Sequence, residues 1–300
     1  MAITQPTAFS RAADLRSGKG SRDENFPVAS LLLDKRHREP ILAFYRFARV
    51  ADDVADHREL TPTAKLEILD RLEAGLDGAS TQDPEAVELK ATLAARGLCD
   101  HHARALLQAF RQDATVNRYH SWLELMDYCA HSAMPVGRFV LEVHGEDRAT
   151  RSASDAVCAA LQIINHLQDC AQDYRRLDRV YLPLDMLARE GARVEELGAA
   201  AASQPLRNTI QNLAARADHL LDMGDRLGGQ IKDRRLAREI AVIIALARHN
   251  AARLRVEDPL QGGGRTRKSK ALLIMLATLL RSLAPHGSAS ERRTLDDAGA

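Results

Sequence analysis

Apolar residues recur at three- and four-residue spacing along almost the whole chain, and this periodicity restricts the fold more than any other feature. Such spacing gathers apolar side chains on one face of an α-helix. It predicts helices over residues 38–57, 62–77, 84–97, 99–116, 121–144, 152–176, 204–228, 232–254 and 267–283. Runs that alternate between apolar and polar residues, which would predict strands, are missing. We therefore expect an all-α protein.

Residues that favour helix boundaries lie where the periodicity starts and stops. Thr61-Pro62 is typical of a helix start, and Gly145 follows the end of another predicted helix. Pro135 lies inside the segment 121–144, where it removes a backbone hydrogen bond and predicts a kink. Gly137 next to it has no side chain, so a neighbouring backbone or a ligand can approach closely.

Neither an internal repeat nor a long Pro- and Ser-rich linker divides the 300 residues. One helical bundle is then the simplest arrangement, and we expect it to span residues 25–284. Residues 1–24 and 285–300 mix Gly, Ser, Arg and Asp without apolar periodicity. We expect both segments to be flexible tails.

The composition argues against several kinds of partner. Lys and Arg number 42 and Asp and Glu 41, so a formal net charge of +1 gives no reason to expect nucleic acid binding. We find neither a signal-peptide pattern nor an apolar run long enough to span a bilayer. The four cysteines lack the spacing of zinc sites. We expect a cytoplasmic protein whose contact with a membrane, if any, is peripheral.

The first candidate site lies in residues 41–56, which are apolar on most of the helix circumference and predict a buried helix. At about 100° per residue, one narrow sector carries Tyr45, Arg49, Asp52 and Asp56, with Asp53 beside it. A solvated face explains many Asp pairs with this spacing, but a buried carboxylate needs a cation, a metal or a watery cavity. Three Asp beside one Arg leave an excess of negative charge that suits Mg²⁺.

Residues 156–174 repeat this construction about 110 residues later. Asn165, Asp169 and Asp173 are four residues apart and fall on one stripe of the predicted helix. Like charges at this spacing cost helix stability unless something binds them. Two such helices facing each other would hold Mg²⁺ ions, and the ions could hold a diphosphate. Arg179 and Tyr181 follow the stripe, and surface solvation is the alternative role for Arg179.

These motifs resemble those of the squalene/phytoene synthase family of head-to-head prenyl transferases. Residues 52–56 are similar to its first aspartate-rich motif, and residues 165–173 followed by 178–183 are similar to its second. The resemblance runs from about residue 25 to residue 275. Within the family, three segments most resemble the bacterial hydroxysqualene synthase branch of the hopanoid pathway: residues 24–28, 45–49 and 132–138. The resemblance implies an isoprenoid synthase helical bundle with a central cavity.

The resemblance also implies roles for individual residues. The residues implied to bind Mg²⁺ are Asp52, Asp56, Asn165, Asp169 and Asp173. Asp53 would support them, and these six form the expected catalytic set. The residues implied to surround the substrate diphosphate are Tyr45, Arg49, Arg179 and Tyr181. Candidate walls for a C30 chain are Phe44, Tyr45, Phe47, Tyr128 and Phe139, with core packing as the default role for Phe44 and Phe47.

The implied reaction is a Mg²⁺-dependent conversion of presqualene diphosphate to hydroxysqualene with release of diphosphate. Many relatives carry a phosphate-binding stretch where this chain has Asp23-Glu24-Asn25, a difference that favours one preformed C30 diphosphate over two farnesyl diphosphates. One alternative is a head-to-head synthase that makes presqualene diphosphate, squalene or phytoene from two prenyl diphosphates. Another is a non-catalytic family member that acts as a binding or assembly factor.

Overall fold

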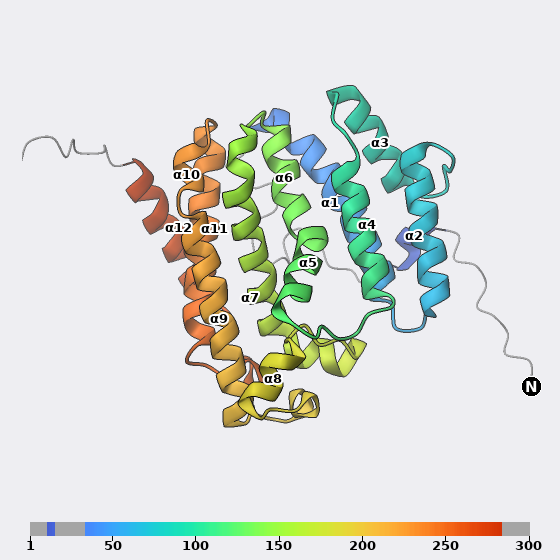
Figure 1. Ribbon diagram of the computed structural model, residues 1–300. Helices are drawn as coiled ribbons and strands as arrows, with labels where there is room; N and C mark the ends of the chain where they lie inside the picture. The colour runs from blue at the N-terminus through green and yellow to red at the C-terminus, as the bar shows by residue number, and fades with distance from the viewer. Residues whose placement is uncertain (1–10, 16–33, 284–300) are drawn as a thin grey trace, which may run out of the picture.

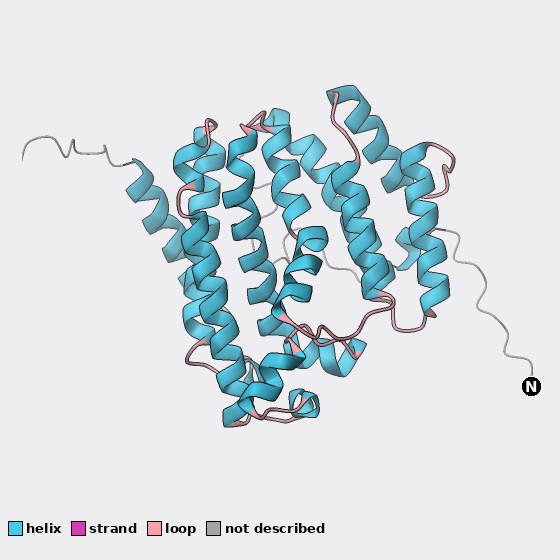
Figure 2. Ribbon diagram, viewed as in Figure 1, coloured by secondary structure: helices cyan, strands magenta, loops and turns pink. Residues whose placement is uncertain are grey.

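The computed structural model describes residues 11–15 and 34–283, which form helices joined by short loops (Figure 1). Within these residues there is no β-strand, and one isolated bridge pairs Arg118 with Val180 (Figure 2). The predicted all-α class is confirmed. Most of the two predicted tails, together with residues 24–28 and Asp23-Glu24-Asn25, lies outside the described residues.

The short helix η1 spans Ala12–Leu15. The α-helices are α1 Lys35–Ala55, α2 Pro62–Asp77, α3 Pro84–Arg96, α4 His101–Asp113, α5 Trp122–Ser132, α6 Met134–Val143, α7 Arg151–Leu177, α8 Leu184–Glu190, α9 Gln204–Gly224, α10 Leu227–Gln230, α11 Arg234–Leu254 and α12 Lys268–Leu283. Further 3-10 turns are η2 Arg148–Thr150, η3 Val194–Gly198 and η4 Pro259–Gln261.

Local sequence explains where several helices begin and end. Thr61 caps α2, because its hydroxyl oxygen accepts a hydrogen bond of 3.2 Å from the amide of Ala64. The segment 121–144 divides into α5 and α6 around Ala133, just before Pro135, so the predicted kink is a full break. The sequence missed α8 and α10, which are too short to show a clear periodicity.

Helix α7 is central to one half of the bundle, where it packs against α6, α9 and α11, while α1 packs against α3 and α4 in the other half (Figure 1). Gly137 allows the close approach of α6 and α7. A Cβ atom at this position would lie 2.5 Å from Sγ of Cys158 and 2.5 Å from Oγ of Ser154. The atoms that approach Gly137 belong to side chains, whereas the sequence suggested a neighbouring backbone or a ligand.

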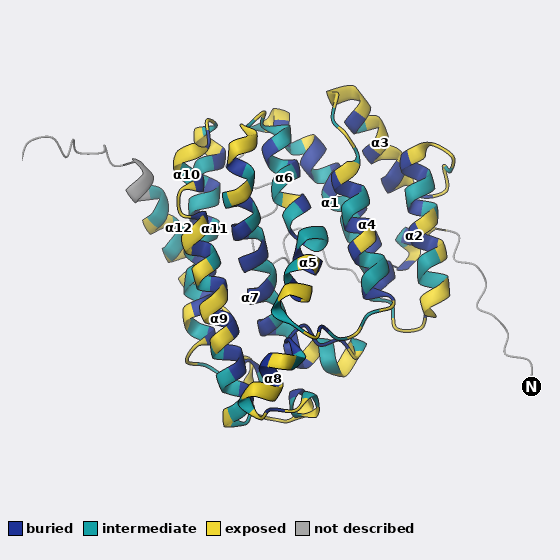
Figure 3. Ribbon diagram, viewed as in Figure 1, coloured by how far each residue is buried: buried dark blue, intermediate teal, exposed yellow. Residues whose placement is uncertain are grey.

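Two large apolar clusters form the core, and the buried positions in Figure 3 follow them. One is built around α7, α9 and α11, and the other around η1 and α1 to α4. Phe44, Phe47 and Phe139 belong to the second cluster, where the rings of Phe44 and Phe139 stack with centroids 4.1 Å apart. Core packing therefore accounts for these three side chains. In the described part of the chain, no helix has the length and apolar character required to cross a membrane.

Candidate active site

The acidic stripe of α1 is organised by Arg49. Its guanidinium donates to Asp52 at 2.9 Å and to Asp53 at 2.5 Å. The Asp53 side chain is almost fully buried, whereas 36% of the Asp52 side chain remains exposed. Loss of water around the carboxyl, and then the negative charge of Asp56, raise the pKa of Asp52 well above its ordinary value. Tyr45 lies on the same helix, one turn before Arg49.

Arg179 joins the two predicted motifs. It is buried, and its guanidinium donates to a carboxylate oxygen of Asp56 and, at 2.8 Å, to the carbonyl of Ala55 at the end of α1. A third hydrogen bond, of 3.1 Å, reaches the carbonyl of Asp113 at the end of α4. Asp56 and Arg179 are thus brought together across 123 residues of sequence.

The turn after α7 explains how Arg179 reaches this position. Asp178 ends the helix with a left-handed backbone, φ 53°. The next amide, that of Arg179, donates back to the carbonyl of Asp173 at 3.3 Å. The amide of Val180 then donates to the carbonyl of Asn117 at 2.9 Å. These bonds fix the chain direction, so that Arg179 and Tyr181 enter the interior.

Asp113 is a part of the site that the sequence reading missed. Its two carboxylate oxygens accept hydrogen bonds from Tyr181 at 2.8 Å and from Tyr128 at 2.9 Å. Burial raises the pKa of Asp113 to about 6, against the opposing influence of Arg179 and both tyrosines. The available signal was its register: Asp113 continues the buried stripe of α4 that includes Leu106 and Ala109.

An arginine also pairs with the acidic stripe of α7. Asp169 forms an ion pair with Arg265, which belongs to the loop before α12. The loop is held there by Gln168, whose side-chain amide donates to the carbonyl of Gly264 at 2.8 Å. Gly264 has φ +81° and a Cβ would meet Leu254 at 2.5 Å, so glycine is required. The remaining stripe residues, Asn165 and Asp173, are partly exposed on α7.

The donor set fits a hard cation, because the five proposed ligands offer only carboxylate and amide oxygens. Desolvation, and then the charge of Asp56, raise the pKa of Asp52, and a bound cation would oppose both effects. Among the described residues, however, no three of these carboxylates come within 4.8 Å of one another. The groups that do so lie elsewhere: His37 with His144 and Asp233, and His101 with His102 and Glu142.

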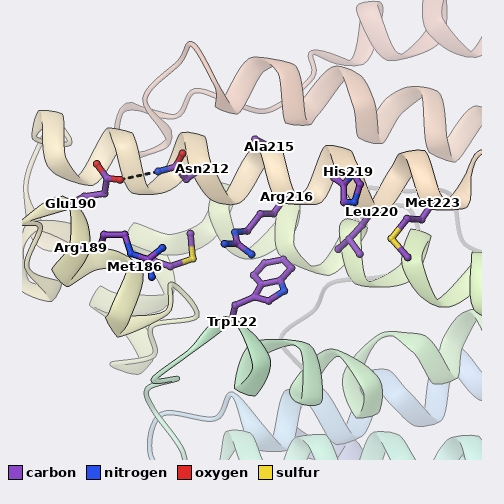
Figure 4. Close-up of a pocket in the computed structure, with 10 residues that line it drawn as sticks. All are labelled: Trp122, Met186, Arg189, Glu190, Asn212, Ala215, Arg216, His219, Leu220 and Met223. Carbon is purple, nitrogen blue, oxygen red and sulfur yellow. Dashed lines mark hydrogen bonds between the residues drawn. The ribbon is translucent and has the colours of Figure 1, made fainter.

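A separate groove of about 650 Å³ lies between α8, α9 and the start of α5 (Figure 4). Trp122 and Arg216 face each other across it, with the guanidinium carbon 5.0 Å from the ring centre. Its other lining residues include Met186, Asn212 and His219. None of the predicted site residues lines this groove.

The structure thus joins the first motif to the end of the second through Arg179, Asp113 and Tyr181. The hydrogen-bond donors of Arg179 and Tyr181 are, however, already paired with acceptors of the protein.

An all-α bundle with an acidic stripe on each of two helices is the architecture of isoprenoid synthases. Solved structures with this fold are similar to the chain. A dehydrosqualene synthase in complex with a ligand matches with a TM-score of 0.75 at 20% identity, covering 90% of this chain and 94% of that one.

The sequence comparisons then identify the family. The family profile of squalene/phytoene synthases matches residues 20–271, and the chain belongs to this family. A hydroxysqualene synthase of Rhodopseudomonas palustris is 55% identical over 249 residues, which cover 83% of this chain and 85% of that protein. The squalene synthase HpnC of Alicyclobacillus acidocaldarius has a TM-score of 0.65 at 30% identity, covering 91% of this chain and 94% of that one. The chain is an enzyme of this family.

Proposed function

We propose that the protein converts presqualene diphosphate to hydroxysqualene with release of diphosphate, in a Mg²⁺-dependent reaction of hopanoid biosynthesis. Its 55% identity to a hydroxysqualene synthase, over most of both chains, supports this choice within the family. The structural observation that carries it is the pairing of each acidic stripe with an arginine, Asp56 with Arg179 and Asp169 with Arg265. Each arginine could exchange its hydrogen bond to a carboxylate for one to an incoming phosphate.

The residues of the two stripes have separate tasks in this proposal. The Mg²⁺ ligands would be Asp52, Asp56, Asn165, Asp169 and Asp173. Bound there, Mg²⁺ would neutralise diphosphate oxygens as the leaving group takes the electron pair of the breaking C–O bond. Arg49 holds Asp53 and Asp52 in place. Tyr45, Arg49, Arg179 and Tyr181 would contact the diphosphate.

Loss of diphosphate leaves a cyclopropylcarbinyl cation, which opens to an allylic cation that water captures. The apolar interior shields this cation from other nucleophiles. The buried aromatic ring of Tyr128 would offer it the negative face of its π system. No hydride enters the reaction, so a reductant is not required.

Incubation of the purified protein with Mg²⁺ and either presqualene or farnesyl diphosphate tests this function. We expect presqualene diphosphate to give an alcohol whose oxygen comes from labelled water, and NADPH to change neither rate nor product. Rapid formation of presqualene diphosphate from farnesyl diphosphate would instead support a condensing synthase. NADPH-dependent formation of squalene would contradict the alcohol product, and no turnover of either substrate would point to a binding factor.

We further propose that the enzyme works in the cytoplasm against the surface of an anionic membrane. The face of α12 supports this location, because Leu272, Leu273 and Leu276 are 51%, 61% and 47% exposed. Exposed basic residues adjoin them, Arg267, Lys268 and Lys270. From Arg265 to the end of α12 there is no acidic residue, so another copy of this face would be repelled and an anionic lipid surface attracted.

A further inference from the structure

A buried nitrogen without a hydrogen-bond partner lies within the second acidic motif, on α7. It is Nε2 of His166, which follows Asn165 on α7. In the part of the chain that the structure describes, this atom is shielded from solvent and has no partner. Burying such a group unpaired costs free energy, so a molecule that pairs with it is favoured.

The ring of His166 is held by its neighbours. It stacks on Tyr181 with centroids 3.5 Å apart and an interplanar angle of 15°, and it lies 5.9 Å from the ring of Tyr128. Both tyrosines are fixed by hydrogen bonds to Asp113. His166 is therefore positioned by the same cluster that surrounds Arg179, at the junction of the two motifs.

The other polar groups of this cluster are already engaged. Asp113 accepts from two tyrosines, and Arg179 donates to three acceptors. The Tyr119 hydroxyl also lacks a partner, but this residue is only 2% exposed and lies in the apolar core. His166, by contrast, is partly exposed and lies on the same helix as three proposed metal ligands.

From this geometry we propose that His166 positions the water molecule that captures the allylic cation; the inference rests on the proposed function. With the ring proton on Nδ1, Nε2 accepts a hydrogen bond from the water and turns the oxygen lone pair outward, toward the cation. The water oxygen then forms the new C–O bond. The proton that it loses goes to an oxygen of the released diphosphate, and His166 keeps its protonation state throughout.

His131 serves as the control histidine, since it lies at the surface and away from the cluster around His166. Its Nδ1 is 3.0 Å from the carbonyl of Asp127, and it lines a surface pocket that includes Glu73 and Arg138. His131→Phe should therefore leave the reaction unchanged. His166→Gln retains an acceptor on the side chain, whereas His166→Phe retains only the ring.

The test measures diphosphate release and product composition separately, with presqualene diphosphate, Mg²⁺ and labelled water. For His166→Phe we expect release within about threefold of the wild type, while the alcohol share of the product falls about tenfold and unhydroxylated hydrocarbon rises. His166→Gln should restore most of the alcohol. Thermal unfolding of each variant, followed by circular dichroism, checks that the fold is retained.

The outcomes separate the two proposals. If the wild type gives no alcohol, the proposed function fails and the role of His166 fails with it. If the wild type gives the alcohol and His166→Phe gives the same share, only the role of His166 is overturned. An equal loss of diphosphate release and alcohol would also overturn it, because a merely structural residue would have that effect.

Discussion

At the scale of single residues, the candidate site holds carboxylates whose negative charge the neighbouring arginines do not fully neutralise. Asp52 lies among other carboxylates, and desolvation together with Asp56 raises its pKa. A group whose pKa is raised on folding opposes folding in its charged form. In the proposed function, the acidic residues of α1 therefore serve the reaction at the expense of stability.

Asp52→Ala should abolish turnover at saturating Mg²⁺, because one proposed metal ligand is removed. The free energy of unfolding should stay the same or rise, since a mutually repelling carboxylate is gone. Activity assays and urea denaturation measure the two effects. Asp127→Ala, at an exposed position on α5, is the matched control and should keep its activity. Near-wild-type turnover by Asp52→Ala would contradict the metal assignment.

Asp113 should give the stability of the protein a measurable pH dependence. Its pKa is about 6 in the folded protein against an ordinary value of 3.8, so folding favours the protonated form. Its contribution to stability is present below the unfolded pKa and is lost as the pH rises through about 6. Asp113→Asn should remove this part of the dependence, as measured by urea denaturation from about pH 4 to pH 7. Identical slopes in both proteins would contradict the assignment.

At the scale of helices, the sequence predicted the features that depend on residues close together along the chain. The stripe of Asn165, Asp169 and Asp173 follows from helical geometry alone, and most helix positions follow from apolar periodicity. The sequence predicted the break at Ala133 only as a kink. A proline such as Pro135 disrupts a helix, but its presence alone does not determine whether the helix bends or divides in two.

The partners of the acidic residues could not be predicted in the same way. Arg265 pairs with Asp169 across 96 residues, and local spacing carries no information on such contacts. Asp113 was missed because a single Asp in an amphipathic helix is usually solvated. Its position on the apolar stripe of α4 was the available signal.

The contact between α6 and α7 should be sensitive to a single methyl group. Gly137→Ala places a Cβ 2.5 Å from both Cys158 Sγ and Ser154 Oγ. We expect a loss of about 1–3 kcal/mol in the free energy of unfolding, from overpacking. Gly228→Ala is the control in α10, since a Cβ there meets nothing within 4 Å. Equal stability of the two variants in urea would show that α6 and α7 can separate at little cost.

The exposed face of α12 should determine membrane binding. Replacing Leu272, Leu273 and Leu276 by Ser removes apolar area, and replacing Lys268 and Lys270 by Gln removes charge. Each change should reduce co-sedimentation with vesicles that contain anionic lipid by about tenfold, and high salt should weaken the wild type. Leu123→Ser, at a position 77% exposed on α5, should not alter binding. Wild-type binding by both α12 variants would exclude this face.

At the scale of the whole molecule, the two halves of the bundle meet where Asp56 pairs with Arg179, and the proposed metal ligands come from both halves. A ligand that binds only the folded state stabilises it by an amount that grows with the logarithm of the ligand concentration relative to Kd. Mg²⁺ and inorganic diphosphate together should therefore raise Tm, by the equivalent of about 2.7 kcal/mol at one hundred times Kd. Diphosphate with EDTA should have a much smaller effect. An equal rise with EDTA would show that the arginines alone hold the phosphate.

The ion pair between Asp169 and Arg265 has a consequence for the order of synthesis. Helix α7 leaves the ribosome long before the loop at Gly264 and Arg265 exists, so its acidic stripe first appears without this cation. Asp56 likewise waits for Arg179, which is made 123 residues later. A nascent chain that ends before Arg265 should therefore present repelling carboxylates on α7 and compete poorly for diphosphate. Under the proposed function, we expect diphosphate binding only after the last part of the domain has been translated.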